Sequence, residues 1–303
     1  MTIINFTEAH AEEATRLSQA AYEEERVLVP ALPDMQVPDL RHFAQNNLGV
    51  AAFEGDTMLG FLCAQGPFKK AFGTTPVMGV WSPMHANTAV GDKARVYHRM
   101  YQAAAQKWVK AGALAHSVTL YEHDEAAKQA FFTYGFGMRC IDAVKLLDAD
   151  TAVPKGDFLE LPRERFGDIL KLSKALNRHC GESPFFLNRR FSPDREKDIR
   201  IFAARQGERL VAHLKIRENG ETFATRAPDM LNICGVYAVP KARGTGLYSN
   251  LLRYTEATLA KEGYARLGVD YESFNATALY FYPKHFDVYT NSLVRRIDER
   301  GNR

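Results

Sequence analysis

The sequence predicts an α/β protein built from two tandem domains of the same fold. Two observations carry this prediction. The chain has 303 residues, whereas a single domain commonly holds about 100–200, and one order of apolar strands and amphipathic helices occurs twice along it. In each half that order is strand, helix, hairpin, strand, helix, strand, helix and strand. A mixed sheet with helices on its faces would bury the apolar stripes of these elements.

The two copies keep a nearly constant spacing. The first helices, in EEATRLSQAAYEEE and in GDFLELPRERFGDILKLSKALNRH, place Ser18 and Ser173 155 positions apart. Two glycine turns, each between two apolar runs, predict hairpins whose first glycines are 152 positions apart. The last short aromatic helices place Phe131 and Tyr282 151 positions apart. Spacings that stay within 151–155 positions at three places indicate that one structural unit is repeated.

A linker is predicted between the copies. Pro154 and Gly156 interrupt the pattern within DADTAVPKGD, where neither a helix nor a strand is expected to continue. The predicted domains are therefore 1–150 and 156–303.

Composition and charge exclude several classes of protein. Hydrophobic residues make up 46% of the chain and charged residues 25%, which is typical of globular proteins and not of a disordered chain or a fibre. The net charge of +3 comes from basic residues that are dispersed, so no nucleic-acid partner is predicted. The four cysteines lie far apart, without C-x2-C pairs or Cys/His clusters, so we expect neither a disulfide framework nor a metal site.

No targeting segment is predicted. The N-terminal MTIINFTEAHAEEATRL lacks the basic start and apolar run of a signal peptide. No apolar stretch reaches 18 residues, so no membrane span or membrane partner is expected. The expected compartment is the cytoplasm.

The segment PKARGTGLYSNLL, residues 240–252, carries the most specific local signal. An apolar strand enters it, an Arg-Gly-x-Gly turn follows, and a helix leaves. Gly244 and Gly246 allow a tight turn and close approach of a ligand to the backbone. The first N–H groups of the helix carry partial positive charge, and Arg243 adds a cation. Such a loop suits a phosphate or pyrophosphate, although it matches neither a P-loop nor a dinucleotide fingerprint.

A second segment follows at VDYESFNATALYFYPKHF, residues 269–286, where a strand ends near Glu272 and Asn275 opens a short helix. In this order the two segments resemble the GNAT superfamily of acyl-coenzyme A dependent N-acyltransferases. The family's two motifs, R-x-x-G-x-G/A and N-x-x-A-x-x-[LF]-Y, align with these residues: Arg243, Gly246 and Tyr248, then Asn275, Ala278, Phe281 and Tyr282. The sequence departs from the family at Tyr248, where Gly or Ala is usual, and at His285-Phe286, where Gly-Phe is usual and comes one residue later.

The resemblance implies an acetyl-CoA dependent N-acetyltransferase with its active site in the second domain. The pantetheine arm would lie between the splayed fourth and fifth strands, and the pyrophosphate on the loop at 243–248. Tyr282 would protonate the leaving thiolate as general acid, and backbone N–H groups between Val236 and Ala238 would polarise the thioester oxygen. The cofactor-binding residues implied are Val236, Ala238, Val239, Arg243, Gly244, Thr245, Gly246, Leu247, Tyr248, Asn275 and Tyr282.

Several residues are candidates for the base that takes a proton from the substrate ammonium. Asp270 lies on the fifth strand, where some family members place a carboxylate, and Glu272 shares its strand face. Asn232, on the fourth strand, could hold a water, and His213, on the hairpin, is a further candidate. The sequence leaves the choice among them open.

The first domain resembles the same fold without its chemistry. Thr119 stands at the position of Asp270, Asp124 at that of Asn275, and Phe131 at that of Tyr282, so the general acid is replaced by a ring without a hydroxyl. No Arg-Gly-x-Gly follows Pro83. We expect a structural or substrate-shaping domain; a second catalytic site and a regulatory pocket formed by Tyr121, His123 and His85 are the alternatives.

Two readings of the whole protein compete. One is an enzyme that acetylates a primary amine of a small molecule or peptide, and the other is a non-catalytic acyl-CoA binding or sensing protein on the same fold. The acceptor is left open, although the segment at 180–193 would lie beside it by analogy with the family.

Overall fold

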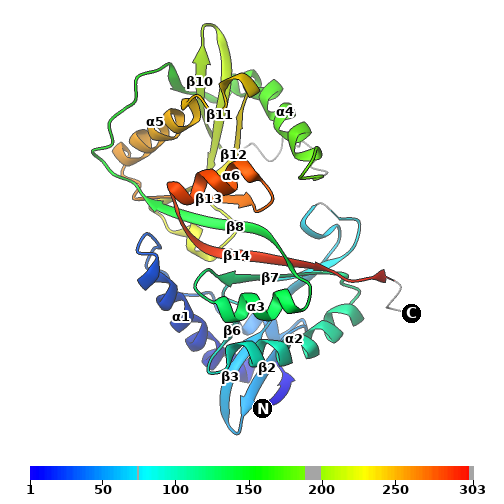
Figure 1. Ribbon diagram of the computed structural model, residues 1–303. Coiled ribbons are helices and arrows are strands. Elements are labelled where there is room, and N and C mark those ends of the chain that lie inside the picture. Colours follow the sequence, from blue (N-terminus) through cyan, green and yellow to red (C-terminus); the bar gives the residue numbers. More distant parts are fainter. Residues whose placement is uncertain (74, 188–198, 300–303) are drawn as a thin grey trace. The chain divides into compact units, whose positions relative to one another are not determined.

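The computed structural model describes residues 1–73, 75–187 and 199–299, and the chain divides into two compact units. The first unit consists of Met1–Asp142 together with Val288–Arg303, and the second of Ala143–Asp287 (Figure 1). Two strands carry the chain between the units: β8 (Gly137–Leu146) enters the second unit, and β14 (Asp287–Arg296) returns to the first.

Strands of the first unit form two hydrogen-bonded groups. One has the order β1-β2-β3-β6, formed by β1 (Thr2–Asn5), β2 (Val50–Glu54), β3 (Thr57–Leu62) and β6 (Asn87–Ala89). The other has the order β4-β5-β7-β14 and adds β4 (Gln65–Phe68), β5 (Gly79–Ser82) and β7 (Ala115–Tyr121). The helices are α1 (Ala11–Leu28), α2 (Lys93–Lys110) and α3 (Glu125–Thr133).

Helices α1 and α2 cover opposite faces of the β2–β3 hairpin. Side chains alternate across a strand, and the buried residues of β2 alternate accordingly. Val50 and Ala52 belong to the core cluster that includes Met100 and Trp108 of α2. Ala51 belongs to a second cluster with α1 residues. The unit is therefore a three-layer structure of helix, sheet and helix, as the alternating apolar pattern predicts.

The strand VMGVWSP, predicted to end at Pro83, forms as β5 and ends at Ser82, and a further strand, β6, follows it that was not predicted. β5 runs parallel to β7, whereas β6 runs antiparallel to β3. Pro83 lies directly after β5 and cannot donate a backbone hydrogen bond to a sheet. Its carbonyl accepts the N–H of Ala86 at 2.8 Å, which closes a turn between the two strands.

The second unit contains one run of strands in the order β9-β10-β11-β12-β13. Their bounds are β9 (Phe158–Glu160), β10 (Arg200–Gln206), β11 (Arg209–Arg217), β12 (Met230–Ala238) and β13 (Arg266–Glu272). The helices are α4 (Leu170–Gly181), α5 (Leu247–Lys261) and α6 (Ala276–Phe281).

Helices α4 and α5 lie on opposite sides of β10 and β11 (Figure 1). On the face of α5, Phe202 contacts Tyr254 with ring centroids 6.2 Å apart. The neighbouring residues Ile201 and Ala203 point to the other face, where they form a cluster with Ile169 at the start of α4. The predicted mixed α/β fold with helices on both faces is confirmed.

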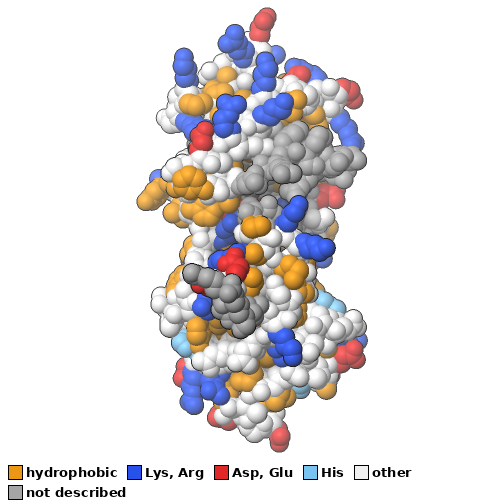
Figure 2. Space-filling view, turned by 90° about the vertical axis from the view of Figure 1, so that its right-hand side faces the viewer, with side chains coloured by type: hydrophobic (Ala, Val, Ile, Leu, Met, Phe, Trp, Pro, Cys, Tyr) orange, Lys and Arg blue, Asp and Glu red, His pale blue; other side chains and the backbone are white. Residues whose placement is uncertain are grey.

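The element order predicted from the sequence is also found in the structure. Both hairpins form, and both short aromatic helices begin where expected. On the face shown in Figure 2, Lys and Arg side chains are interspersed with Asp and Glu. Across the described ranges, no helix combines the length and hydrophobicity needed to cross a membrane.

Candidate active site

Strands β12 and β13 of the second unit separate halfway along their length. They pair in parallel from Met230 with Arg266 to Ile233 with Val269. Beyond that point both continue without pairing further with each other, while β12 stays paired with β11 up to Ala238. A bulge at Cys234 marks the separation, because β11 pairs Ile216 with Ile233 but Lys215 with Gly235. The paired part of β12 is buried and the rest is only half-buried. A gap in the backbone pairing therefore opens between the two strands.

Backbone groups of β12 line this gap. The N–H of Val239 donates to the carbonyl of Val211 at 2.9 Å, so it faces β11. Since hydrogen-bonding direction alternates along a strand, the N–H groups of Val236 and Ala238 face the opposite edge, where β13 has turned away. Two of the three β12 residues expected to bind a thioester thus present N–H groups to the gap, and Val239 uses its own within the sheet.

The loop after β12 is shaped by two glycines. Gly244 has φ 72° and Gly246 φ 80°, a conformation that costs other residues about 1–2 kcal/mol. A Cβ built on either glycine would meet no atom within 4 Å, so the backbone conformation and not crowding requires glycine. The Arg243 Nε donates to the carbonyl of Ala238 at 3.0 Å, and its guanidinium lies 5.3 Å from the ring centre of Tyr237. Arg243 therefore braces the loop against β12.

Helix α5 starts directly at this loop. The Asn250 N–H donates to the carbonyl of Gly246 at 3.0 Å, which is the first hydrogen bond of the helix. The N–H groups of Tyr248 and Ser249, in the first turn, have no acceptor within the helix. They carry the positive end of the helix dipole, so this helix start fits the pyrophosphate of coenzyme A.

Tyr282 lies directly after α6 and is nearly enclosed, with 6% of its surface exposed. Its hydroxyl oxygen is 2.9 Å from that of Tyr248. Its ring stacks on Tyr271 at 5.1 Å and meets Phe286 edge-on at 5.6 Å. Burial raises the pKa of Tyr282 to about 12, and the hydrogen bond with Tyr248 opposes that rise. The side chain is thus fixed as a protonated phenol.

Asn275 holds the helix that precedes Tyr282. Its side chain accepts the N–H of Ala278 at 3.3 Å, so it is the N-cap of α6. Asp124 does the same for α3 in the first unit, where it accepts the N–H of Ala127 at 3.0 Å. The predicted equivalence of the two positions is confirmed at the level of hydrogen bonds.

Asp270 and Glu272 are half-buried at the end of β13. Tyr271 between them faces Tyr282, so both carboxylates point to the other face of the sheet. Asp270 is still close enough to Tyr282 to raise the pKa of that phenol. The two carboxylates and the phenol thus flank the end of β13 from opposite faces.

Asn232 and His213, the other candidates for the base, have different surroundings. The Asn232 amide donates to the carbonyls of Glu218, at 2.9 Å, and Thr225, at 3.3 Å, and so ties down the chain between β11 and β12. His213 is fully buried, and neither ring nitrogen has a hydrogen-bond partner within the described part of the chain. Burial lowers the pKa of His213 to about 3, which makes it a weak base.

Sequence reasoning did not find the rings that fix Tyr282. Tyr271 and Phe286 hold the phenol, and the hydroxyl of Tyr248 was not expected to reach it. The period of two along β13, which places Tyr271 opposite the carboxylates, was the available signal for the first of these.

The segment at 180–193 is described only in part. Phe185 is 9% exposed and contacts Phe274 at 5.8 Å, edge to face. Together with Cys180 and Leu187 it forms a small apolar cluster beside the end of β13. Positions 188–193 lie outside the described residues.

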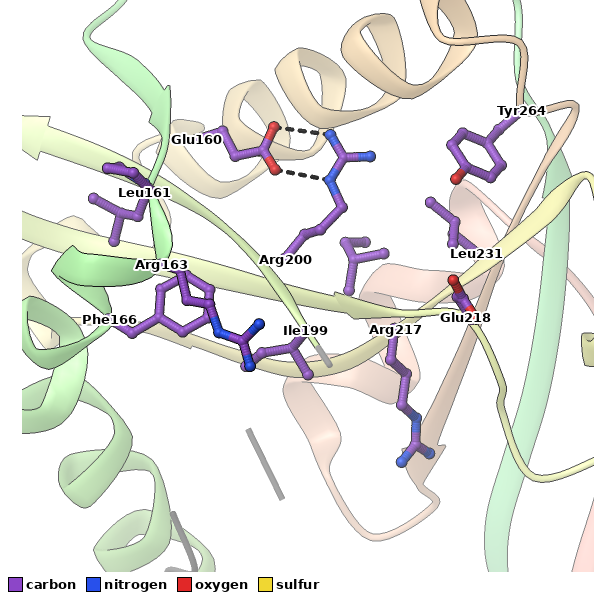
Figure 3. Close-up of a pocket in the computed structure, with 12 residues that line it drawn as sticks. Glu160, Leu161, Arg163, Phe166, Ile199, Arg200, Arg217, Glu218, Leu231 and Tyr264 are labelled. Atoms are coloured by element: carbon purple, nitrogen blue, oxygen red, sulfur yellow. Dashed lines mark hydrogen bonds and ion pairs between the residues drawn. The ribbon is translucent and has the colours of Figure 1, made fainter. Parts of the chain in front are cut away.

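Two cavities lie elsewhere in the second unit. One, of about 660 Å³, is at the end of β10–β12 that lies away from the gap (Figure 3). In it the Arg200 side chain points to Glu160, whereas the Arg217 side chain points away from this pair. The other, of about 440 Å³, lies beside α5 and includes Ser249, Arg253 and His285. In the part of the chain that is described, no three His, Cys, Asp or Glu side chains are grouped to hold a metal ion.

The comparisons with known proteins agree with this geometry. Residues 167–287 match the model of the acetyltransferase (GNAT) family. No curated protein matches the chain.

Three solved structures resemble the chain over nearly its whole length. A GCN5-related N-acetyltransferase from Sphaerobacter thermophilus is 12% identical, with a TM-score of 0.59 over 97% of this chain and 95% of that one. A GNAT-family acetyltransferase from Colwellia psychrerythraea is 11% identical, with a TM-score of 0.51 over 98% and 100%. A GCN5-related glucosamine N-acetyltransferase region in a fungal multi-domain GH3 β-N-acetylglucosaminidase is 10% identical, with a TM-score of 0.54 over 97% of this chain and 38% of that one.

At such identities the structural likeness shows the fold, and the family match places the GNAT domain in the second unit. The chain therefore has a tandem GNAT-like fold, and its residues 167–287 match the model of the acetyltransferase (GNAT) family.

Proposed function

We propose that the protein transfers the acetyl group of acetyl-CoA to a primary amine of a small molecule or peptide, in the second unit. The observation that carries this proposal is the separation of β12 and β13, with the glycine loop directly after β12 and Tyr282 stacked on Tyr271 of β13. A thioester placed in the gap would meet N–H groups on one side and a phenol on the other. Both are needed for attack by an amine on a thioester.

In this mechanism the N–H groups of Val236 and Ala238 stabilise the developing oxyanion. Asp270 or Glu272 takes a proton from the substrate ammonium, and the neutral amine attacks the carbonyl carbon. The C–S bond then breaks, and the O–H of Tyr282 gives its proton to the departing sulfur. The nitrogen of the new amide loses its second proton to solvent, and the Tyr282 phenolate takes up a proton from solvent, so that the acid is restored. Placing acid and base on opposite faces of the strands lets the cosubstrate and the acceptor approach from different sides.

The N-terminal domain is non-catalytic in this proposal. Phe131, at the position of Tyr282, is 1% exposed within the core and has no proton to give. Thr119, at the position of Asp270, shares hydrogen bonds with Ser292 and Trp81.

A second candidate function is non-catalytic binding of an acyl-CoA. It is favoured by one observation: the hydroxyl that would serve as acid already has a partner in Tyr248. Binding without turnover would be its signature.

The experiment that separates the two functions measures binding and turnover on the same protein. Calorimetry with acetyl-CoA tests the loop, and release of the coenzyme A thiol tests turnover with a panel of amines that includes a polyamine, glucosamine and a peptide N-terminus. Acetyl transfer that falls about a hundredfold in Tyr282→Phe, with little change in KM, supports the enzyme. Tyr280→Phe is the matched control, because this neighbouring tyrosine is 72% exposed. Tight binding with no transfer to any amine supports the sensor, and absence of binding contradicts both.

A further inference from the structure

The side chains of Tyr248, which is half-buried, and Tyr282, which is enclosed, meet at their hydroxyl groups. Their oxygens are 2.9 Å apart, within the range of a hydrogen bond between hydroxyls. Tyr248 comes from the first turn of α5, and Tyr282 from the end of α6. The contact therefore links the phosphate-binding helix to the proposed general acid.

Both rings are held in place by neighbours. The Tyr248 ring contacts Phe281 with centroids 5.0 Å apart, and the Tyr282 ring lies against Tyr271 and Phe286. The two hydroxyls cannot separate without disturbing this aromatic cluster. Their pairing is a built feature of the site.

We infer that Tyr248 is a positioning residue for acetyl transfer: its hydroxyl donates to the oxygen of Tyr282 and leaves the Tyr282 proton directed at the departing sulfur. The inference rests on the proposed function of the second unit. It gives a role to a residue that stands where a smaller one was expected.

The proposed role requires one direction of this hydrogen bond, since the structure allows either hydroxyl to be the donor. Each phenol has one O–H and can also accept. If Tyr282 donated to Tyr248, its proton would be taken up within the protein and could not reach the sulfur. With Tyr248 as donor, the proton of Tyr282 stays available, and the phenolate left after transfer keeps a hydrogen bond to its oxygen.

Because Tyr282 is enclosed, a hydrogen bond to its oxygen matters for its acidity. An enclosed phenol is a poorer acid than one in water, because a phenolate is costly to bury. The hydrogen bond from Tyr248 acts against that cost, in the direction that lowers the pKa of Tyr282. Tyr248 is also only half-buried, so it lies between the enclosed phenol and solvent, from which the lost proton must return.

Two measurements test the inference. The first is NMR of the ring ζ-carbons in protein labelled at tyrosine, without cosubstrate. Tyr248→Phe is expected to shift the resonance of Tyr282, and Tyr280→Phe is expected to leave it in place. An unmoved Tyr282 resonance in Tyr248→Phe would show that the hydroxyls do not pair, and would overturn the inference whatever the protein catalyses.

The second measurement is a double-mutant cycle on acetyl transfer to the best amine of the panel. Tyr248→Phe should lower kcat about tenfold with KM for acetyl-CoA nearly unchanged. In a Tyr282→Phe background the same substitution should change kcat less than about twofold, because Tyr248 acts only through Tyr282. Equal losses in both backgrounds, or a rise in KM alone, would overturn the positioning role and leave the proposed function intact. An unchanged kcat in Tyr282→Phe would instead reject Tyr282 as the general acid. No turnover in the unmodified protein would reject the proposed enzyme. Either result would also reject the role of Tyr248.

Discussion

The side-chain amide of Asn87 donates to the carbonyl oxygen of Thr119, 3.2 Å away, and joins β6 to β7 in the first unit. The same amide lies 3.1 Å from the Ser82 hydroxyl and 3.0 Å from the Pro83 carbonyl, and its oxygen accepts the Tyr97 hydroxyl at 3.0 Å. In the second unit the equivalent strands separate and leave a gap. The first unit instead joins its strands through a buried amide, which fits the prediction that this unit is non-catalytic.

Asn87→Ala is expected to destabilise the first unit by about 2–3 kcal/mol, because it leaves the buried Tyr97 hydroxyl without its acceptor. Both tryptophans, Trp81 and Trp108, belong to this unit, so fluorescence during denaturant unfolding reports on it. The exposed Gln102→Ala on α2 is the control. Acetyl-CoA affinity should be the same in Asn87→Ala as in the unmodified protein. A changed affinity would contradict the assignment of the cosubstrate to the second unit alone.

Gly246→Glu is expected to weaken acetyl-CoA binding at least about tenfold, because it puts a negative charge at the helix start that would hold the pyrophosphate. Gly207→Glu is the matched control: Gly207 also has a positive φ, of 58°, and equal space for a Cβ, but it lies in the β10–β11 turn. Both variants should lose a similar free energy of unfolding, about 1–2 kcal/mol. Equal affinities for acetyl-CoA by calorimetry would show that the loop does not bind the cosubstrate.

His213→Leu is expected to keep kcat and to improve stability in acid. Burial lowers the pKa of His213 to about 3, below its ordinary value, so the folded protein binds fewer protons than the unfolded chain. Its presence therefore costs stability as the pH falls below about 6.5. The stability gained by His213→Leu, from denaturant unfolding followed by circular dichroism, should be larger at about pH 5 than at about pH 7. Asp270→Asn is the comparison variant, since it removes a candidate base. Loss of kcat in His213→Leu but not in Asp270→Asn would indicate that His213 is the base and Asp270 is not.

The sequence predicted most of the fold because its signals are local. Helix spacing, the two hairpin turns and the caps at Asp124 and Asn275 each depend on a few adjacent residues. Pairing between distant segments has no such signal. Nothing local shows that β14 pairs with β7, or that a short strand, β6, follows Pro83 and pairs with β3.

In the candidate site, too, local features could be predicted from the sequence and contacts between distant segments could not. Gly244, Gly246 and Tyr282 could be identified from motifs, because their roles depend on backbone conformation or on one functional group. The partners of Asn232 and of Tyr248 depend on contacts between remote segments, across 7–34 positions of sequence, and only the three-dimensional structure reveals them. The same is true of His213, whose ring nitrogens have no hydrogen-bond partner among the described residues.

The pair formed by His123 and the buried Glu25 predicts a pH-dependent stability of the first unit. Both the backbone N–H and the Nδ1 of His123 contact the Glu25 carboxylate, which is 1% exposed. The hydrogen bond to Glu25 raises the pKa of His123 above its ordinary value, against the effect of burial. The folded state therefore holds this proton more tightly than the unfolded chain. The resulting stabilisation is complete below about pH 6.5 and is lost as the pH rises through the folded pKa.

Glu25→Gln removes the charge that holds this proton, so NMR should show the pKa of His123 falling in that variant. The loss of stability caused by Glu25→Gln, measured by tryptophan fluorescence during unfolding, should be larger at about pH 6 than at about pH 9. An equal loss at both values would mean that the imidazole is neutral throughout and that Glu25 acts only as a hydrogen-bond acceptor. Because the pair joins the end of α1 to the chain after β7, the same measurement shows whether a charge or only a hydrogen bond holds that helix on its sheet.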